Sequence, residues 1–166
     1  MVDRQVQILI GSDSDAPIMQ KTVEVLKQLG VSCHMTVASA HRSPDRVRQL
    51  IESSQSQGVK VFIVGAGAAA HLAGVVAAHS ILPVIGVPID SSPLKGWDAL
   101  LATVQMPPGV PVATVSVGNA GAINAGVLAA QILAIGDKQI ASALKNYKMS
   151  LAAKVEHAAE KLEERN

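Results

Sequence analysis

Two long stretches without charged side chains constrain the fold of this 166-residue chain more than any other feature. No Asp, Glu, Lys or Arg occurs in Val61–Ile89 or in Val104–Gly136. Apolar sequence of this length occurs in membrane spans, and also in buried parallel strands covered by helices on both faces. Histidines, prolines and asparagines interrupt these stretches, and no basic cluster flanks them. We therefore expect buried strands and no association with a membrane.

Apolar segments of strand length alternate with helical segments along the whole chain. This alternation predicts right-handed βαβ units, one doubly wound parallel sheet and a single α/β domain over residues 1–166. The expected strands are Val6–Ile10, Cys33–Ala38, Val59–Val64, Val84–Val87 and Val112–Val117. The expected helices are Pro17–Leu29, Pro44–Gln57 with Ser43 as N-cap, Leu72–Ser80, Trp97–Val104, Asn124–Ile135 and a C-terminal helix over Lys138–Glu164.

Composition narrows the classes of partner. The 14 Lys and Arg residues balance 13 Asp and Glu, which argues against a nucleic-acid partner. The single Cys33 excludes an internal disulfide, and the first residues lack the apolar core of a signal peptide, so we expect a cytoplasmic protein. Only Phe62, Trp97 and Tyr147 are aromatic, so small side chains must fill the core. Abundant alanine-rich faces also suit subunit contacts, and we expect a homo-oligomer.

The C-terminal helix carries an apolar stripe whose partner the sequence leaves open. Its apolar residues recur every three or four positions and therefore lie on one helix face. Packing on the parent domain and docking on a neighbouring subunit both agree with this pattern. The stripe consists of Ile140, Leu144, Tyr147, Leu151, Val155, Ala158 and Leu162.

Most of the distinctive polar residues follow the expected strands. Ligands of open α/β sheets bind at the carboxyl ends of the strands, so these residues are expected to share one rim. In strand order they are Ser12, Asp13, Ser14 and Asp15; Ser39, His41 and Arg42; Gly65, Gly67 and His71; Asp90, Ser91 and Ser92; and Gly118 and Asn119.

Two positions on this rim suit a small phosphorylated metabolite. His41 is an imidazole of the kind that transfers protons near neutral pH, and Arg42 beside it is a permanent cation suited to a phosphate. A second histidine, His71, follows the third strand. The hydroxyls and amides of the segment from Ser12 to Asp15 suit a phosphate, and its carboxylates suit ribose hydroxyls. The same segment is equally suited to capping the next helix, and the sequence leaves both roles open.

Several other kinds of site are disfavoured. The acidic residues and His41 lack a recognised metal-ligand spacing, so no metal is expected. A phosphate-binding loop of the form Gly-x4-Gly-Lys-Ser/Thr is absent, and the expected third and fifth strands lack the Asp and Lys of a receiver domain. The segment Gly65–Ala70 fits the dinucleotide fingerprint G-x-G-x-x-A, with Asp90 further along, although it follows the third strand rather than the first.

Five motifs together resemble those of the N5-carboxyaminoimidazole ribonucleotide mutases of purine biosynthesis, over about residues 6 to 135. The motifs are Gly11-Ser12-Asp13-Ser14-Asp15, Ser39-Ala40-His41-Arg42-Ser43-Pro44-Asp45, Gly65-Ala66-Gly67-Ala68-Ala69-Ala70-His71-Leu72, Gln105-Met106-Pro107 and Asn119-Ala120-Gly121.

The resemblance implies a flavodoxin-like three-layer fold, an octamer, and no metal or organic cofactor. The implied reaction moves a carboxylate from the exocyclic nitrogen of aminoimidazole ribonucleotide to ring carbon 4, in the pathway to IMP. By the same resemblance, Ser12 and Asp15 contact the ribose phosphate, Arg42 contacts the phosphate, and His41 is the general acid and base. As a hypothesis, Ser39 and His71 orient the carboxylate, and Ala68, Ala69, Ala70 and Leu72 wall a pocket for the carbon dioxide released between the two steps.

Two alternatives and three departures accompany this interpretation. Related carboxylases that use free carbon dioxide carry Lys in place of Arg42 and lack the equivalent of His71, so both residues favour the mutase over direct carboxylation of aminoimidazole ribonucleotide. The other alternative is a dinucleotide-binding module built on Gly65–Ala70. The chain departs from the family pattern at Ala68, Ala73 and Pro108. The methyl group of Ala68 is expected to narrow the carbon dioxide pocket or to shift its loop.

Overall fold

The computed structural model describes residues 4–164 of the chain. Five parallel strands form one sheet in the order β2-β1-β3-β4-β5, which is the flavodoxin-like order. The strands are β1 (Val6–Ile10), β2 (Cys33–Val37), β3 (Val61–Gly67), β4 (Val84–Ile89) and β5 (Ala113–Thr114). The helices are η1, a short 3-10 turn (Asp13–Asp15), α1 (Ala16–Gln28), α2 (Pro44–Ser56), α3 (Leu72–His79), α4 (Trp97–Val104), α5 (Gly118–Ala134) and α6 (Lys138–Glu163).

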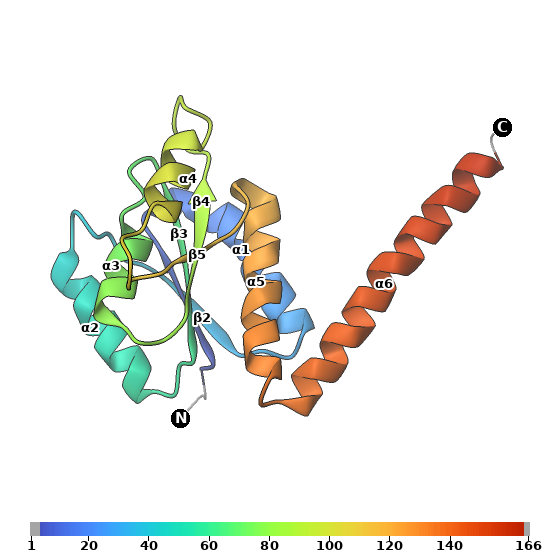
Figure 1. The fold of residues 1–166 in the computed structure, drawn as a ribbon, viewed down its shortest axis with the longest axis horizontal. Coiled ribbons are helices and arrows are strands. Elements are labelled where there is room, and N and C mark those ends of the chain that lie inside the picture. Colours follow the sequence, from blue (N-terminus) through green and yellow to red (C-terminus); the bar gives the residue numbers. More distant parts are fainter. Residues whose placement is uncertain (1–3, 165–166) are drawn as a thin grey trace.

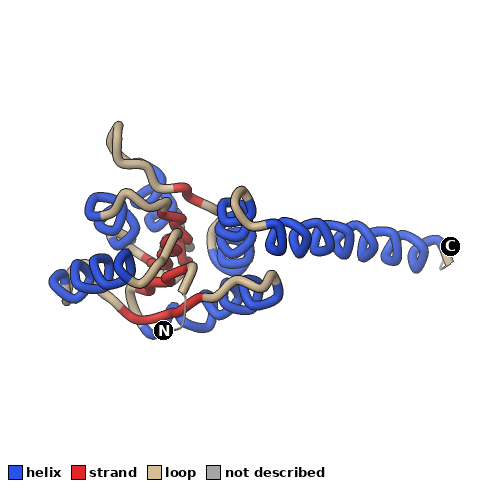
Figure 2. Tube along the Cα trace, turned by 90° about the horizontal axis from the view of Figure 1, so that it is seen from below, coloured by secondary structure: helices blue, strands red, loops and turns tan. Residues whose placement is uncertain are grey.

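Helices cover both faces of the sheet, so the expected three-layer α/β fold is confirmed (Figures 1 and 2). Helices α1 and α5 pack on one face and on each other, and α2, α3 and α4 pack on the other. Aliphatic residues dominate both core clusters, and Phe62 is the only ring among the buried hydrophobic residues of the described part. The two charge-free stretches become buried strands with their helices, and no helix among residues 4–164 is long and apolar enough to cross a membrane.

The third strand is displaced from its expected position. It was expected at Val59–Val64 but runs from Val61 to Gly67, because β1 pairs with it up to Gly65 and β4 pairs with it up to Gly67. Gly65 fits within the strand because Met19 and Ile89 occupy the space where its side chain would lie. Gly65, the first glycine of the segment that fits the dinucleotide fingerprint, is therefore a strand residue with a packing role and not part of a phosphate-binding turn. This geometry does not favour the dinucleotide interpretation.

The fifth strand and the helix after it also differ from expectation. The strand Val112–Val117 was expected, but only Ala113 and Thr114 pair with β4, at the edge of the sheet. Helix α5 begins at Gly118 rather than at Asn124. This early start is possible because Gly121 has no side chain, since a Cβ there would overlap the backbone oxygen of Ser116.

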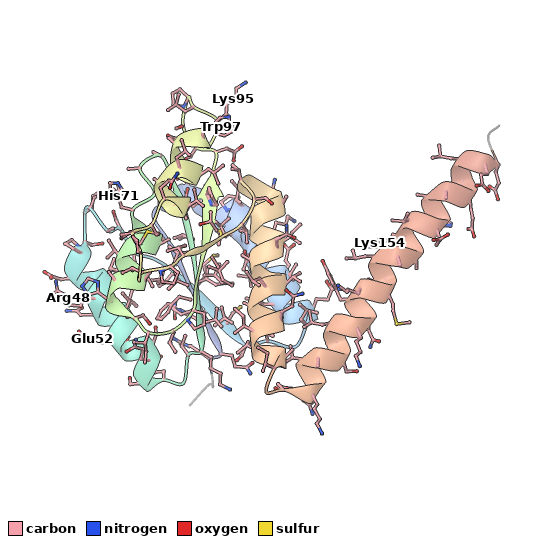
Figure 3. The ribbon with its side chains drawn as sticks, in the orientation of Figure 1. Arg48, Glu52, His71, Lys95, Trp97 and Lys154 are labelled. Carbon is pink, nitrogen blue, oxygen red and sulfur yellow. The ribbon has the colours of Figure 1, made fainter. Side chains whose placement is uncertain are left out.

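The final helix is divided into a packed part and an exposed part. Ile140 is buried, and Leu144 and Tyr147 lie against the core cluster that α1 and α5 form with the sheet. Every residue from 148 to 164 is exposed, and Figures 1 and 3 show this half of α6, with Lys154 on it, standing clear of the domain. The chain thus packs the first half of the stripe on its own domain and leaves the second half, including Leu151 and Val155, uncovered.

Candidate active site

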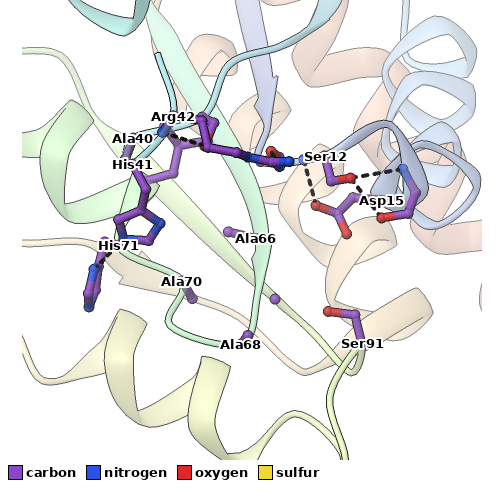
Figure 4. A pocket seen from close by; sticks show the side chains of 15 residues that line it. Ser12, Asp15, Ala40, His41, Arg42, Ala66, Ala68, Ala70, His71 and Ser91 are labelled. Atoms are coloured by element: carbon purple, nitrogen blue, oxygen red, sulfur yellow. Dashed lines mark hydrogen bonds between the residues drawn. The ribbon is translucent and has the colours of Figure 1, made fainter. Parts of the chain in front are cut away.

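A pocket of about 180 Å³ lies at the carboxyl ends of the strands (Figure 4). Strand β1 lies between β2 and β3, so the chain crosses from one side of β1 to the other, and such a switch point is where open α/β sheets bind ligands. All six predicted site residues line this pocket. Its lining is Gly11, Ser12, Ser14, Asp15, Ser39, Ala40, His41, Arg42, Ala66, Gly67, Ala68, Ala70, His71, Leu72 and Ser91.

The loop after β1 forms a capped turn that directs hydroxyls into the pocket. The Ser12 backbone N–H donates to Asp15 Oδ2 at 3.1 Å, and the Ser12 hydroxyl accepts from the Ser14 N–H at 3.4 Å. This reciprocal pair is a capping box, so the capping role left open by the sequence is present. The Ser14 hydroxyl donates to Ser12 Oγ at 2.9 Å and also lies at the pocket. Capping therefore fixes the loop without removing its hydroxyls from the ligand side.

Asp15 is the buried acid of this loop, with 4% of its surface exposed. Burial raises the pKa of its carboxyl above the ordinary value, the hydrogen bond from the Ser12 backbone opposes that shift, and the charge of Asp13 adds to it. The Asp15 carboxylate is thus held by the backbone of its own turn at the edge of the pocket, where a ligand hydroxyl can reach its second oxygen.

The loop after β2 carries His41 and Arg42 and is tied by serine hydroxyls. The Ser39 hydroxyl accepts from the Arg42 N–H at 3.2 Å, and the Ser43 hydroxyl accepts from the Ser39 N–H at 3.2 Å. Ser43 occupies the N-cap position of α2 as expected, but its side chain makes no cap hydrogen bond because it closes this loop instead. The tight loop fixes the backbone beneath the imidazole and the guanidinium.

Arg42 and His41 extend in different directions from this loop (Figure 4). The Arg42 guanidinium reaches across to the end of β1, where Nη2 donates to the Gly11 carbonyl at 3.4 Å. It is exposed, and its remaining N–H groups are available beside the hydroxyls of Ser12 and Ser14. One end of the pocket therefore combines a fixed cation with hydroxyl donors, the arrangement that binds a phosphate group.

His41 turns the other way and meets His71 from the loop after β3. His41 Nε2 lies 2.7 Å from His71 Nδ1, and the rings are nearly perpendicular with centroids 4.8 Å apart. Residues 30 positions apart in the chain thus form one pair at the second end of the pocket.

The wall between the two ends is apolar and comes from the loop that joins β3 to α3. Ala68, Ala70 and Leu72 line it as expected, whereas Ala69 is exposed and lies outside the lining, so that part of the expectation is wrong. The turn is closed by the Ala70 N–H donating to Gly67 O at 3.0 Å. Ala68 and Ala70 adopt positive φ angles of 51° and 46°, which turns the chain at residue 69 away from the pocket.

Some rim residues lie elsewhere, and one that had no assigned role belongs to the site. Asp90 and Ser92 are not part of the lining, and neither are Gly118 and Asn119, which form the start of α5 where a longer strand was expected. Ser91, which follows β4, lies opposite His41 in the pocket (Figure 4). Its position after a buried strand could have indicated a site residue. The close approach of its hydroxyl to β3 is possible only because Gly67 has no side chain.

Two motifs of the resemblance lie outside the lining of this pocket. A Cβ at Gly74 in α3 would lie 3.2 Å from the sulfur of Met106, so the Gln105-Met106-Pro107 motif packs on α3 through its methionine. The Asn119-Ala120-Gly121 motif forms the first turns of α5. Among residues 4–164, no three His, Cys, Asp or Glu side chains gather closely enough to hold a metal ion.

Comparisons with known proteins agree with the resemblance. Residues 5–154 match the family model described as AIR carboxylase. The chain is 48% identical over 160 residues to the N5-carboxyaminoimidazole ribonucleotide mutase of Thermotoga maritima, covering 96% of this chain and 92% of the relative. It is 52% identical over 139 residues to the Bacillus subtilis protein of the same name, covering 84% and 86%.

A solved structure supports the same relationship. The crystal structure of Treponema denticola PurE superposes with a TM-score of 0.86 at 31% sequence identity, covering 95% of this chain and 97% of that one. The family match spans all the residues that line the pocket and all five strands. The chain therefore belongs to the AIR carboxylase family.

Proposed function

We propose that this protein converts N5-carboxyaminoimidazole ribonucleotide into 4-carboxy-5-aminoimidazole ribonucleotide in purine biosynthesis. The proposal rests on the loop after β2, which directs Arg42 to the hydroxyl-rich end of the pocket and His41 to the other end. A ribonucleotide has a phosphate at one end and a reacting base at the other, so it matches this polarity. The mutase names of the relatives support the same reaction.

In the proposed complex, Arg42 and the hydroxyls of Ser12 and Ser14 hold the phosphate. Asp15 accepts a hydrogen bond from the ribose. Ser39, which also lines the pocket, donates to the carboxylate. These contacts fix the base beside His41, and positioning of this kind supplies a large part of many catalytic rate enhancements.

The proposed chemistry uses one imidazole twice. As the bond between the exocyclic nitrogen and the carboxylate breaks, its electron pair stays on nitrogen, which takes a proton from protonated His41. Carbon dioxide is released against the wall formed by Ala68, Ala70 and Leu72. Ring carbon 4 then bonds to the carbon dioxide and loses its proton to His41. The proton count returns to its starting value, so the cycle calls for no metal or organic cofactor.

The test is conversion of synthetic carbamate substrate by the purified protein, with and without added bicarbonate. We expect conversion without bicarbonate, and retention of a carbon-13 label from the substrate carboxylate when unlabelled bicarbonate is present. His41→Asn is expected to lower kcat by about a hundred- to ten-thousand-fold, the usual contribution of positioned proton transfer. The control is His79→Asn, at an exposed histidine of α3 outside the pocket lining. Full activity of His41→Asn would remove its proposed role, and product formed only from aminoimidazole ribonucleotide with bicarbonate would establish direct carboxylation instead.

We also propose that the protein is a cytoplasmic homo-oligomer, with the octamer implied by the family as the expected state. The exposed half of α6 supports this proposal because large apolar side chains there are open to solvent, among them Met149, Leu151 and Val155. Light scattering should give about eight times the 17.2 kDa of one chain. Val155→Glu should lower that mass, whereas a monomer at micromolar concentration in the unsubstituted protein would contradict the proposal.

A further inference from the structure

The contact between His41 and His71 restricts where the protons of the pair can lie. At 2.7 Å the two facing nitrogens must share one proton, because two N–H groups would collide there and two lone pairs would repel. Neither ring makes another hydrogen bond within residues 4–164. Each ring therefore depends on the other for its orientation and its tautomer.

The second nitrogen of His41 is the one that a ligand can reach. Because Nε2 is engaged with His71, Nδ1 remains free, and Figure 4 shows this nitrogen on the side of the ring that faces the pocket. A base needs a lone pair on the atom that faces its substrate. Nδ1 has that lone pair only if the His41 proton lies on Nε2 and points to His71.

We propose that His71 is a positioning residue whose Nδ1 accepts the Nε2–H of His41, leaving Nδ1 of His41 as the atom that exchanges protons with the substrate. This inference rests on the proposed mutase function and assigns a tautomer within it. When Nδ1 takes the proton from ring carbon 4, His41 becomes a cation and its Nε2–H bond to His71 becomes charge-assisted and stronger. When Nδ1 gives that proton to the exocyclic nitrogen in the next turnover, the pair returns to its neutral form.

The position of His71 in the fold suits an acceptor. It is the residue before α3 and its side chain does not cap that helix, so its ring is free to turn toward His41. The positive end of the α3 helix dipole lies beside His71 and disfavours a positive charge on that ring. The positive charge of the pair is therefore more stable on His41. This role differs from direct contact of His71 with the substrate carboxylate, and kinetics can separate the two.

The kinetic test compares His71→Leu with His71→Asn. Leucine removes the acceptor, whereas asparagine places Oδ1 on the Cγ atom, where His71 carries Nδ1, and so keeps an acceptor in nearly the same place. Loss of a charge-assisted hydrogen bond should lower kcat about 10- to 100-fold in His71→Leu, with KM nearly unchanged. His71→Asn should recover most of that loss. A rise in KM with kcat unchanged in both variants would overturn the proposal and indicate carboxylate contact.

The spectroscopic test needs no turnover. Solid-state NMR of ring-15N-histidine protein, near pH 8.5 where imidazoles are ordinarily neutral, reports which nitrogen carries the proton. The signals of His41 are identified by their loss in His41→Asn. We expect a proton on Nε2 and none on Nδ1, a mixture of tautomers in His71→Leu, and the original state in His71→Asn. A proton on Nδ1 of His41 in the unsubstituted protein would refute this inference, while an inactive protein with the expected tautomer would refute only the proposed function.

Discussion

Replacement of Gly121 by alanine should strongly destabilise the protein although this residue lies outside the pocket. The added Cβ would overlap the carbonyl oxygen of Ser116 and stand 2.7 Å from its carbonyl carbon. Both are backbone atoms, so no side-chain rotation can relieve the overlap, and either α5 or the segment before it must move. Gly121 is buried where α5 packs on the sheet, so such a shift would also disturb Ala122 and Ala125 in the core.

Overpacking of a core typically costs 1–3 kcal/mol, and a backbone collision belongs at the upper end, so we expect a loss of about 3 kcal/mol. For a domain of this size that corresponds to a melting temperature lower by roughly 6 to 12 °C. Thermal unfolding followed by circular dichroism at equal protein concentration gives this value. Gly136→Ala is the matched control, because no heavy atom lies within 4 Å of the Cβ that it would add.

The two variants must separate for the packing argument to hold. If Gly121→Ala melts within about 2 °C of Gly136→Ala, then the close approach of Ser116 to α5 does not require glycine at position 121. Specific activity of the Gly121→Ala protein that remains folded should stay within a few-fold of the unsubstituted protein, because the residue touches no ligand in the proposed complex. A selective loss of activity at full stability would instead place this motif in the active site.

Three further outcomes are expected. Ala68 has a left-handed φ of 51°, a conformation that favours glycine. Ala68→Gly should therefore raise the free energy of unfolding, by no more than about 1 kcal/mol, and urea titration measures this change. Burial raises the pKa of Asp15 above its unfolded value of 3.8, so the folded protein binds the proton more tightly than the unfolded chain. The contribution of Asp15 to the free energy of unfolding therefore falls as pH rises from about 4 through the raised pKa. Asp15→Asn should remove this pH dependence from denaturation curves measured across the range. Arg42→Met should raise KM about 10- to 100-fold with a smaller effect on kcat in steady-state assays, since it removes a charge-assisted phosphate contact; an unchanged KM would place the phosphate elsewhere.

Local signals in the sequence were sufficient for the fold class. The strand β1 and the helix α4 lie at their expected bounds. A run of apolar residues and a helical repeat are local patterns, so each can be recognised from the sequence of its own segment. Placement of the polar residues after the strands was also sufficient to bring His41 and Arg42 to one rim, since parallel strands share the direction of their carboxyl ends. All six expected site residues line the pocket for this reason, although their roles remain proposals.

Features that depend on distant neighbours required the tertiary structure. The length of β3 follows from its pairing with β1 and β4. For α6, the structure shows that the first half of the apolar stripe packs on the parent domain, and docking of the second half on a neighbouring subunit stays a proposal. The sequence by itself determined an α/β sheet with a histidine and an arginine on its ligand-binding rim. Only the fold decided that His41 meets His71 at 2.7 Å, because that distance depends on how two loops, 30 residues apart, turn at the ends of strands that do not adjoin each other.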